Sequence, residues 1–255
     1  MAPTDTTSAL SVNVHSGAVE FDGTVLFEEL DVTLAGGCIT CLLGASGVGK
    51  STLLRLILGL EEGPSKGGVV SCSDGRALSG RAALMAQRDL LFPWLSVLDN
   101  VLLGCHLRGE PRQGGARRRR ALGILSDVGL ADWVDAAPDT LSGGMRQRAA
   151  LARTLMEDRP VVLMDEPFSG VDAITKVRLQ NLAARMLKGR TVLLVTHDPL
   201  EALRLGDRIH VMAGRPAHLD ENPLEPDGTA PRDVDDKGVL EMQGVLLRRL
   251  AEAAR

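Results

Sequence analysis

"CLLGASGVGKSTLLRLILG" (residues 41–59) is the stretch that decides the fold of this 255-residue chain. The apolar run ITCLLG (39–44) predicts a buried strand, whereas KSTLLRLIL (50–58) has helical spacing and stops at Gly59. Between the two, residues 44–51 fit the pattern G-x-x-x-x-G-K-[ST]. A glycine-rich turn that joins a strand to a helix in this way is typical of a phosphate-binding loop, so we expect nucleotide binding here.

The chemistry of the loop predicts how it holds a nucleotide. Glycines let successive backbone N–H groups point at phosphate oxygens, and the start of the following helix adds positive potential. Lys50 is expected to reach the β- and γ-phosphates, and Ser51 is expected to bind Mg²⁺. The predicted ATP-binding residues of the loop are Gly44, Ala45, Ser46, Gly47, Val48, Gly49, Lys50, Ser51 and Thr52.

Two further apolar runs, VVLM (161–164) and TVLLVT (191–196), end just as abruptly in polar residues. Such continuous runs are typical of parallel strands covered on both faces, and ligands bind beyond the carboxyl ends of these strands. Asp165, Glu166 and His197 are therefore predicted to lie at the same sheet edge as the loop. The predicted fold class is α/β, with a P-loop NTPase core of the RecA-like type.

Asp165 and Glu166 are neighbours at the end of a strand, so their side chains are expected to diverge. Phosphoryl transfer to water needs a group that holds the metal ion and a group that orients the attacking water. We assign Asp165 to Mg²⁺ and Glu166 to the water; the alternative is that both only cap the following turn. His197 is expected to contact the γ-phosphate or to hydrogen-bond Glu166, with a purely structural histidine as the alternative.

The rest of the chain divides by pattern. Alternation over 11–21 and 24–34 predicts an antiparallel β subdomain, and residues 88–156 look like a helical subdomain inserted in the α/β core. A polar, Pro- and Gly-rich segment over 221–237 is predicted not to pack. The predicted divisions are residues 1–11, a flexible N-terminus; 12–220, the ATPase domain; 221–237, a linker; and 238–255, a C-terminal helix.

Composition and charge argue against several classes of protein. The net charge of −4, from 29 basic and 33 acidic residues, disfavours binding to nucleic acid through phosphates. No secretory signal and no membrane-spanning stretch are recognised, so we expect a cytoplasmic chain that meets a membrane only through a partner. Cys38 and Cys41 form C-x-x-C, but in a strand they would face opposite ways, which favours buried packing over a metal site. The run Arg117–Arg120 is expected to be a solvated helix face.

A second glycine-rich helix start, LSGGMRQRAALAR (141–153), lies within the predicted helical subdomain. Ser142 is a natural N-cap, and Gly143 and Gly144 leave the helix start bare enough for a phosphate to touch backbone N–H groups. With GASGVGKS, Gln87, VVLMDEP, SGVD and THD, this segment completes an ordered set of motifs over about residues 12–220. In this set the chain resembles the ATPase subunits of ABC transporters.

The resemblance explains why one chain would carry two phosphate-contacting segments. It implies a head-to-tail homodimer in which the signature segment of one subunit closes over the ATP held by Lys50 of the other. It also implies that Phe21 stacks on adenine, that Gln87 touches Mg²⁺ and the attacking water, and that Asp172 lies at the dimer interface. At Gly170 and Val171 the sequence SGVD differs from SALD, the motif that is more frequent in the family. The signature residues are Leu141, Ser142, Gly143, Gly144 and Met145.

An apolar stretch, RDLLFPWLSVLDNV (88–101), follows Gln87 directly. Because an exposed apolar patch usually marks a partner surface, we expect Phe92, Pro93 and Trp94 to receive an integral membrane permease. The segments LLFPWLSVLDNV and LSGGMRQRAALAR resemble those of ATPase subunits from importers of nitrate, sulfonates or pyrimidine precursors of thiamine. This implies a peripheral subunit on the cytoplasmic side of a bacterial inner membrane that works with a periplasmic substrate-binding protein.

Two other functions remain open from sequence alone. One is a soluble ABC ATPase acting on nucleic acid or ribosomes, although such proteins commonly carry two ATPase units or a long coiled-coil insertion. The other is a self-contained P-loop kinase, which would leave LSGGM and THD unexplained.

Overall fold

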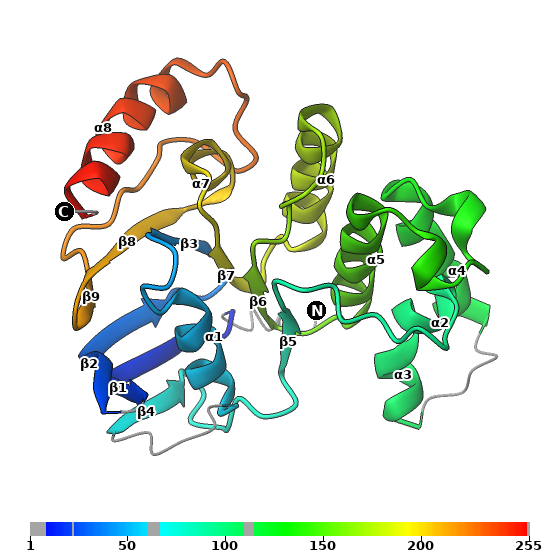
Figure 1. Ribbon diagram of the computed structural model, residues 1–255, viewed down its shortest axis with the longest axis horizontal. Helices are drawn as coiled ribbons and strands as arrows, with labels where there is room; N and C mark the ends of the chain where they lie inside the picture. Colours follow the sequence, from blue (N-terminus) through cyan, green and yellow to red (C-terminus); the bar gives the residue numbers. More distant parts are fainter. Residues whose placement is uncertain (1–8, 22, 61–66, 110–114, 254–255) are drawn as a thin grey trace, which may run out of the picture.

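A six-stranded sheet in the order β5-β6-β7-β3-β8-β9 forms the centre of the computed structural model, which describes residues 9–21, 23–60, 67–109 and 115–253 (Figure 1). The strands β5, β6, β7, β3 and β8 are parallel, and only β9 at the edge is antiparallel. Their bounds are β3, Ile39–Gly44; β5, Ala82–Met85; β6, Val161–Asp165; β7, Thr191–Val195; β8, Arg208–Gly214; and β9, Ala217–Leu219.

The central strands are buried on both faces, which explains their unbroken apolar sequences. In β6, Val162 and Met164 belong to the core on one face of the sheet, whereas Val161 and Leu163 belong to the core on the other. The residues of β3 and β7 alternate in the same way. The predicted α/β class is confirmed, and each strand must therefore take its polar residues to its ends.

A second sheet, in the order β2-β1-β4, is antiparallel and shares a core with helix α1. Helix α1 covers β3, β6 and β7, and it ends at Gly59, whose left-handed φ of 66° suits glycine. Strand β4 extends the predicted pair β1 and β2 and was not anticipated from sequence. The bounds are β1, Val12–Phe21; β2, Thr24–Leu34; β4, Gly67–Cys72; and α1, Lys50–Leu58.

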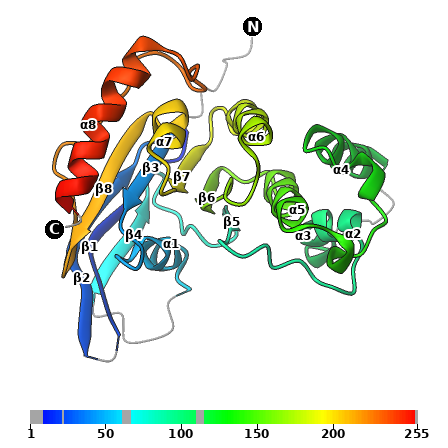
Figure 2. The same ribbon diagram turned by 45° about the horizontal axis from the view of Figure 1, so that its top comes forward.

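The helical subdomain lies to one side of the sheet, beyond β5 and β6, while α8 lies beside β8 at the opposite end (Figure 2). Ser96 and Ser142 cap α2 and α5, each accepting a hydrogen bond from the backbone N–H three residues later. The side chains of Arg117–Arg120 lie exposed on α4, and the last of them, Arg120, pairs with Asp158 at 3.1 Å. The elements are α2, Val97–Val101; α3, Leu103–Leu107; α4, Gly115–Asp127; η1, Ala131–Trp133; η2, Pro138–Thr140; and α5, Gly143–Met156.

Three helices complete the fold: α6 (Ala173–Met186), α7 (Pro199–Leu205) and α8 (Lys237–Ala253). The sequence signals for α7 are confirmed: Asp198 accepts hydrogen bonds from the first turn, Pro199 is the first residue, and the helix stops at Gly206. No helix among the described residues is long and apolar enough to cross a membrane.

The segment between β9 and α8 is exposed over most of 221–237, but it is packed at Pro226 and Arg232, which the prediction of an unpacked linker did not include. Arg232 is only 5% exposed, and its guanidinium donates to five backbone carbonyls. Its backbone N–H and C=O also bond Arg204 of α7. One buried arginine therefore holds part of a segment that its polar composition predicts to be unpacked. The carbonyls belong to Leu203, Gly206, Pro226, Asp227 and Gly228.

The prediction of a flexible N-terminus over residues 1–11 is also wrong for Leu10 and Ser11. Leu10 is 8% exposed, and its carbonyl accepts a hydrogen bond from the Thr191 hydroxyl at the start of β7. The backbone N–H of Ser11 donates to Ser73. Residues 1–8 lie outside the described part of the chain.

Arg232→Met should lower the free energy of unfolding by about 2–4 kcal/mol, because it leaves several buried carbonyls without a donor. Urea unfolding followed by circular dichroism measures the change. The control Arg248→Met, at an exposed position on α8, should change stability by less than about 0.5 kcal/mol. Equal effects of the two variants would contradict the structural role of Arg232.

Candidate functional site

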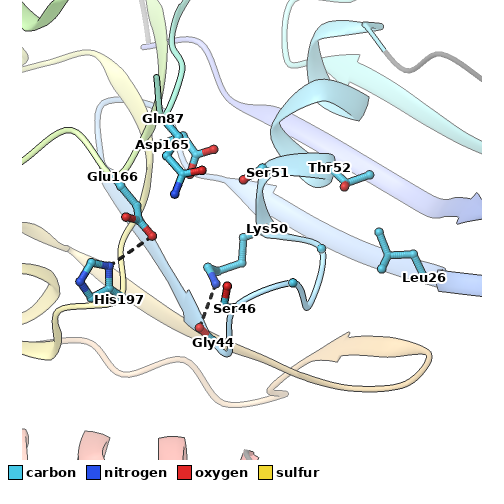
Figure 3. A pocket seen from close by; sticks show the side chains of 12 residues that line it. Leu26, Gly44, Ser46, Lys50, Ser51, Thr52, Gln87, Asp165, Glu166 and His197 are labelled. Carbon is cyan, nitrogen blue, oxygen red and sulfur yellow. Dashed lines mark hydrogen bonds and ion pairs between the residues drawn. The ribbon is translucent and has the colours of Figure 1, made fainter. Parts of the chain in front are cut away.

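A cavity of about 610 Å³ opens at the carboxyl ends of β3, β6 and β7 (Figure 3). It brings together residues that the sequence placed in three separate motifs. Register explains the meeting, because Leu42 lies opposite Val195, which lies opposite Asp165. The cavity is lined by Leu26, Gly44, Ser46, Gly47, Gly49, Lys50, Ser51, Thr52, Gln87, Asp165, Glu166 and His197.

The loop after β3 depends on glycine at two positions where other residues do not fit. Gly44 has φ 151°, and a Cβ there would lie 2.3 Å from the Met212 carbonyl oxygen. Gly49 has φ 116°, and a Cβ would press on Leu26 and Phe27. These glycines let the chain turn from a buried strand directly into α1, which leaves the backbone between them free to line the cavity.

Lys50 points back into this loop from the first turn of α1. Its Nζ donates to the carbonyl oxygens of Gly44 at 2.9 Å and Ala45 at 2.8 Å. Burial lowers the pKa of Lys50, and the carboxylates of Glu166 and Asp165 oppose that shift. The Lys50 ammonium therefore lines the same cavity as the carboxylates of Asp165 and Glu166. Val48, predicted with the loop, packs against the core beneath it.

Ser51, Asp165 and Gln87 meet at the inner end of the cavity (Figure 3). The Ser51 hydroxyl hydrogen-bonds Asp165, whose pKa is raised by burial and lowered in part by that bond. These oxygen donors suit Mg²⁺, which is commonly held by one or two protein groups and by substrate phosphates. Within the described residues, no cluster of three or more His, Cys, Asp or Glu could hold a metal.

Glu166 and His197 form a pair on the other side of the cavity. His197 Nδ1 lies 3.2 Å from Glu166 Oε1, so the contact expected from sequence is present. The Glu166 side chain is 19% exposed and that of His197 is 67% exposed. The imidazole thus covers the carboxylate on its solvent side, and the remaining carboxylate oxygen is available to the cavity.

The backbone of Glu166 takes the left-handed conformation, with φ 50°. For a residue with a side chain this conformation is strained and needs support from its surroundings. The Glu166 carbonyl accepts hydrogen bonds from the Ser169 hydroxyl at 2.9 Å, the Ser169 N–H and the Gln147 side chain at 3.1 Å. Asp165 continues the strand while Glu166 leaves it, which separates the two carboxylates.

Gln147 contacts the turn at Glu166, and sequence reasoning missed it. It lies on α5 only five positions after Ser142, is 7% exposed, and donates to the carbonyls of Glu166 and Pro167. The signature helix is therefore bonded directly to the turn that carries Glu166. A glutamine among the polar residues of RQR gave no local signal of this long-range contact.

The signature segment itself does not reach the cavity. Among the described residues, none of Leu141–Met145 lines it. Ser142 and Gly143 are exposed at the start of α5, and Gly144 approaches the Gly170 carbonyl, where an added Cβ would lie 3.0 Å away. Asp172, two residues further, is exposed and caps α6 by accepting from the Thr175 N–H.

The segment after Gln87 is bonded to the signature helix. Asp89 pairs with Arg146 at 3.0 Å, and Arg146 also donates to the Leu141 carbonyl. Arg153, two turns further along α5, donates to the carbonyls of Asp89 and Leu90. The edge of the cavity and the helical subdomain are thus joined by charged contacts.

Phe92, Pro93 and Trp94 lie on the surface, as the sequence predicts. Trp94 is 75% exposed and Phe92 is 38% exposed, with their ring centroids 5.0 Å apart. Buried Asn100 holds their loop by accepting from the Phe92 N–H and by donating to the Phe92 and Leu95 carbonyls. This apolar surface is therefore presented on a fixed loop.

Two sequence expectations have other outcomes. The backbone of Phe21 ends β1, but its side chain lies outside the described residues, so the adenine contact stays a prediction. Leu26, which the sequence did not single out, supplies an apolar wall of the cavity from β2. All four cysteines are free; Cys41 is buried in β3 and Cys38 precedes the strand, in keeping with packing.

A glycine-rich loop with Lys50, a strand-end pair of carboxylates and an accompanying histidine define a P-loop ATPase. The family model described as ABC transporter matches residues 27–169, and the chain belongs to this family. It is an ATPase of the kind whose ATP hydrolysis is coupled to transport.

Relatives extend the match to most of the chain. An "Uncharacterized ABC transporter ATP-binding protein" of Haemophilus influenzae is 41% identical over 94% of this chain and 98% of its own. "Aliphatic sulfonates import ATP-binding protein SsuB 1" of Rhodococcus jostii is 48% identical over 73% of this chain and 72% of its own. The protein of that name from Pseudomonas savastanoi is 38% identical over 95% and 97%.

The fold is shared with a solved cassette. The ATP-binding cassette MJ0796, in a dimeric post-hydrolysis state bound to ADP and Pi, has a TM-score of 0.75. It is 26% identical, and the match covers 85% of this chain and 99% of that one. The N-terminal antiparallel sheet and the inserted helical subdomain accordingly belong to an ATP-binding cassette.

Glu166→Gln should retain ATP binding and lower the rate of hydrolysis about 100- to 10,000-fold, because the amide cannot accept a proton from the attacking water. Binding is measured by titration with a fluorescent ATP analogue, and turnover by phosphate release. The control Glu252→Gln, an exposed change of the same kind on α8, should hydrolyse ATP normally. Retained hydrolysis by Glu166→Gln would remove Glu166 from its role.

Proposed function

We propose that this chain is the ATP-hydrolysing subunit of an importer, and that it works as a head-to-tail homodimer with two shared ATP sites. The separation of the signature segment from the cavity carries the proposal. Lys50 and Ser142 belong to segments of one chain that contact phosphate in the family, yet only the former lines the cavity. A second subunit would supply the missing face.

The chain's own residues account for the chemistry of hydrolysis. Backbone N–H groups of the loop and Lys50 hold the phosphates, while Ser51, Gln87 and Asp165 would hold Mg²⁺, which would neutralise charge on the phosphates. Glu166 orients a water molecule toward the γ-phosphorus and accepts its proton as the new P–O bond forms. His197 keeps the Glu166 carboxylate in place. Cleavage of the bond to the β-phosphate oxygen yields ADP and inorganic phosphate.

The dimer proposal also draws on the exposure of α5 and on the solved relative. The start of α5 is exposed at Ser142 and Gly143, and the first N–H groups of a helix have no carbonyl partner one turn earlier, which suits the phosphate of an ATP bound elsewhere. Asp172 is exposed beside them, where a second subunit could contact it. The structure of MJ0796 bound to ADP and Pi is described as dimeric.

Ser142→Arg should leave nucleotide binding by each subunit unchanged but block ATP-driven dimerisation, because the larger cation would occupy the space of the partner's phosphate. Light scattering after gel filtration measures dimer formation with ATP in the Glu166→Gln background. Ser126→Arg on α4 is the control and should still dimerise. A normal dimer of the Ser142→Arg variant would refute the shared site.

We further propose a membrane permease as the partner of Phe92, Pro93 and Trp94. The patch is apolar and rigidly held, and it follows Gln87 directly, so docking there could be coupled to the ATP site. The relatives named for aliphatic sulfonate import favour a sulfonate as cargo over another small anion or a pyrimidine precursor of thiamine. On this proposal the subunit lies peripherally on the cytoplasmic side of the inner membrane and receives cargo through a periplasmic substrate-binding protein, with no role for nucleic acid.

Trp94→Ala should weaken co-purification with the permease about tenfold or more, since buried tryptophans commonly dominate interfaces. The tagged Glu166→Gln chain with ATP is used to recover its partner from detergent-solubilised membranes, and mass spectrometry quantifies one multi-span protein. Leu247→Ala on α8, 50% exposed, is the control and should recover the permease fully. Equal recovery with Trp94→Ala would place the permease contact elsewhere.

A further inference from the structure

An ion pair between Asp198, the last residue of the THD motif, and Lys176, which no motif includes, links α6 to the loop that carries His197. Lys176 Nζ lies 2.7 Å from Asp198 Oδ2 and 3.1 Å from Glu201 Oε2. The Lys176 side chain is 24% exposed and that of Glu201 only 2%. Asp198 directly follows His197. Lys176 therefore forms its ion pair one residue away from the histidine that contacts Glu166.

The other end of this connection is the start of α6. Asp172 caps that helix, and its carbonyl accepts a hydrogen bond from the Lys176 N–H at 2.8 Å. Lys176 is therefore one helical turn from Asp172 and bonded to it through the backbone. Because a helical turn is rigid, a displacement of Asp172 would carry Lys176 with it.

The pair is held in its charged form by its surroundings. Burial alone would lower the pKa of Lys176, but the bonds to Asp198 and the charge of Glu201 outweigh it, and the pKa is raised. Burial opposes ionisation of Asp198 as well, yet the lysine and the N–H groups of α7 hold its pKa below the usual value. Burial raises the pKa of Glu201, and removing the lysine would leave this nearly buried carboxyl without a cation, with the neutral Gln180 amide and Thr196 hydroxyl as its hydrogen-bond donors.

We infer that Lys176 is a positioning residue for ATP hydrolysis: through Asp198 it holds the His197 loop to α6, so that Asp172 and the Glu166–His197 pair move together. This rests on the proposed function, in which Asp172 meets the second subunit. Closure of the dimer would move Asp172 and α6, and through Lys176 and Asp198 it would then determine where His197 lies. Lys176 is not among the described residues that line the cavity, so it acts on the reaction through Asp198.

The test compares full-length Lys176→Met, Lys176→Arg and the control Arg178→Met, which changes an exposed cation on the same helix. Lys176→Met should lower kcat about 10- to 100-fold while KM for ATP stays near the wild-type value, because misplacement of a positioned group affects the chemical step. Lys176→Arg should recover most of the loss, and Arg178→Met should behave as wild type. A wild-type kcat for Lys176→Met, or a parallel rise in KM, would overturn the inference.

A double-mutant cycle separates the ion pair from general damage. Asp198→Asn keeps a good N-cap for α7 but removes the charge, so it should lower kcat by a similar factor. In the double variant with Lys176→Met the two losses should not multiply, since both remove one interaction. Multiplying losses would show that Lys176 and Asp198 act independently and would overturn the inference. If Lys176→Met does not fold, Asp198→Asn with unchanged kcat has the same meaning.

Hydrogen exchange tests the positioning without any turnover. In Lys176→Met, amides of residues 196–201 should exchange faster than in the wild type or in Arg178→Met, and unchanged exchange would overturn the inference. Absence of ATP hydrolysis by the wild-type chain would defeat the proposed function instead. The two failures are therefore distinguishable.

Discussion

In-register parallel pairing of β3, β7 and β6 is the constraint on which the rest of the structure depends. Because Leu42, Val195 and Asp165 lie side by side, the three strands end at one level of the sheet. Both faces of these strands are apolar and covered, so polar residues can follow only at the ends. The phosphate loop, the two carboxylates and His197 are consequently placed around one cavity although they lie far apart in the chain. A slip of one residue in any of the three strands would reverse its faces and separate the groups.

Contacts of α5 tie this cavity to the surface of the helical subdomain. Gln147 bonds the turn at Glu166, and Arg146 bonds Asp89 just after Gln87. The same segment continues to the loop of Trp94, which Asn100 holds. Glu166, the segment after Gln87 and the exposed apolar loop of Trp94 therefore all depend on one helix. In the proposed dimer, a displacement of the start of α5 would move each of these segments through its contacts with that helix.

The sequence predicted those parts of the fold that local signals specify. Helix α1 ends at Gly59 and α7 begins at Asp198 because capping and left-handed glycine are properties of neighbouring residues. The cavity residues were predictable because the ends of parallel strands meet by rule. Arg232 and Gln147 were not, since each bonds backbone carbonyls distant in the chain, and carbonyls leave no mark in sequence. Composition alone made 221–237 look unpacked, whereas one guanidinium with five acceptors holds part of it.

Strain at Glu166 shows how the site and its scaffold are matched. A glutamate with φ 50° would relax toward an extended or helical conformation if its carbonyl were free, and either change would rotate the carboxylate away from His197. Its donors come from the turn itself, through Ser169, and from α5, through Gln147. The second of these ties the strained conformation to a helix whose start is exposed. In the proposed dimer, occupation of that helix start by a partner's ATP would bear directly on the geometry of the water-orienting carboxylate. On this proposal the two glycine-rich helix starts have different roles: one binds the nucleotide, and the other would make hydrolysis sensitive to the nucleotide of the second subunit.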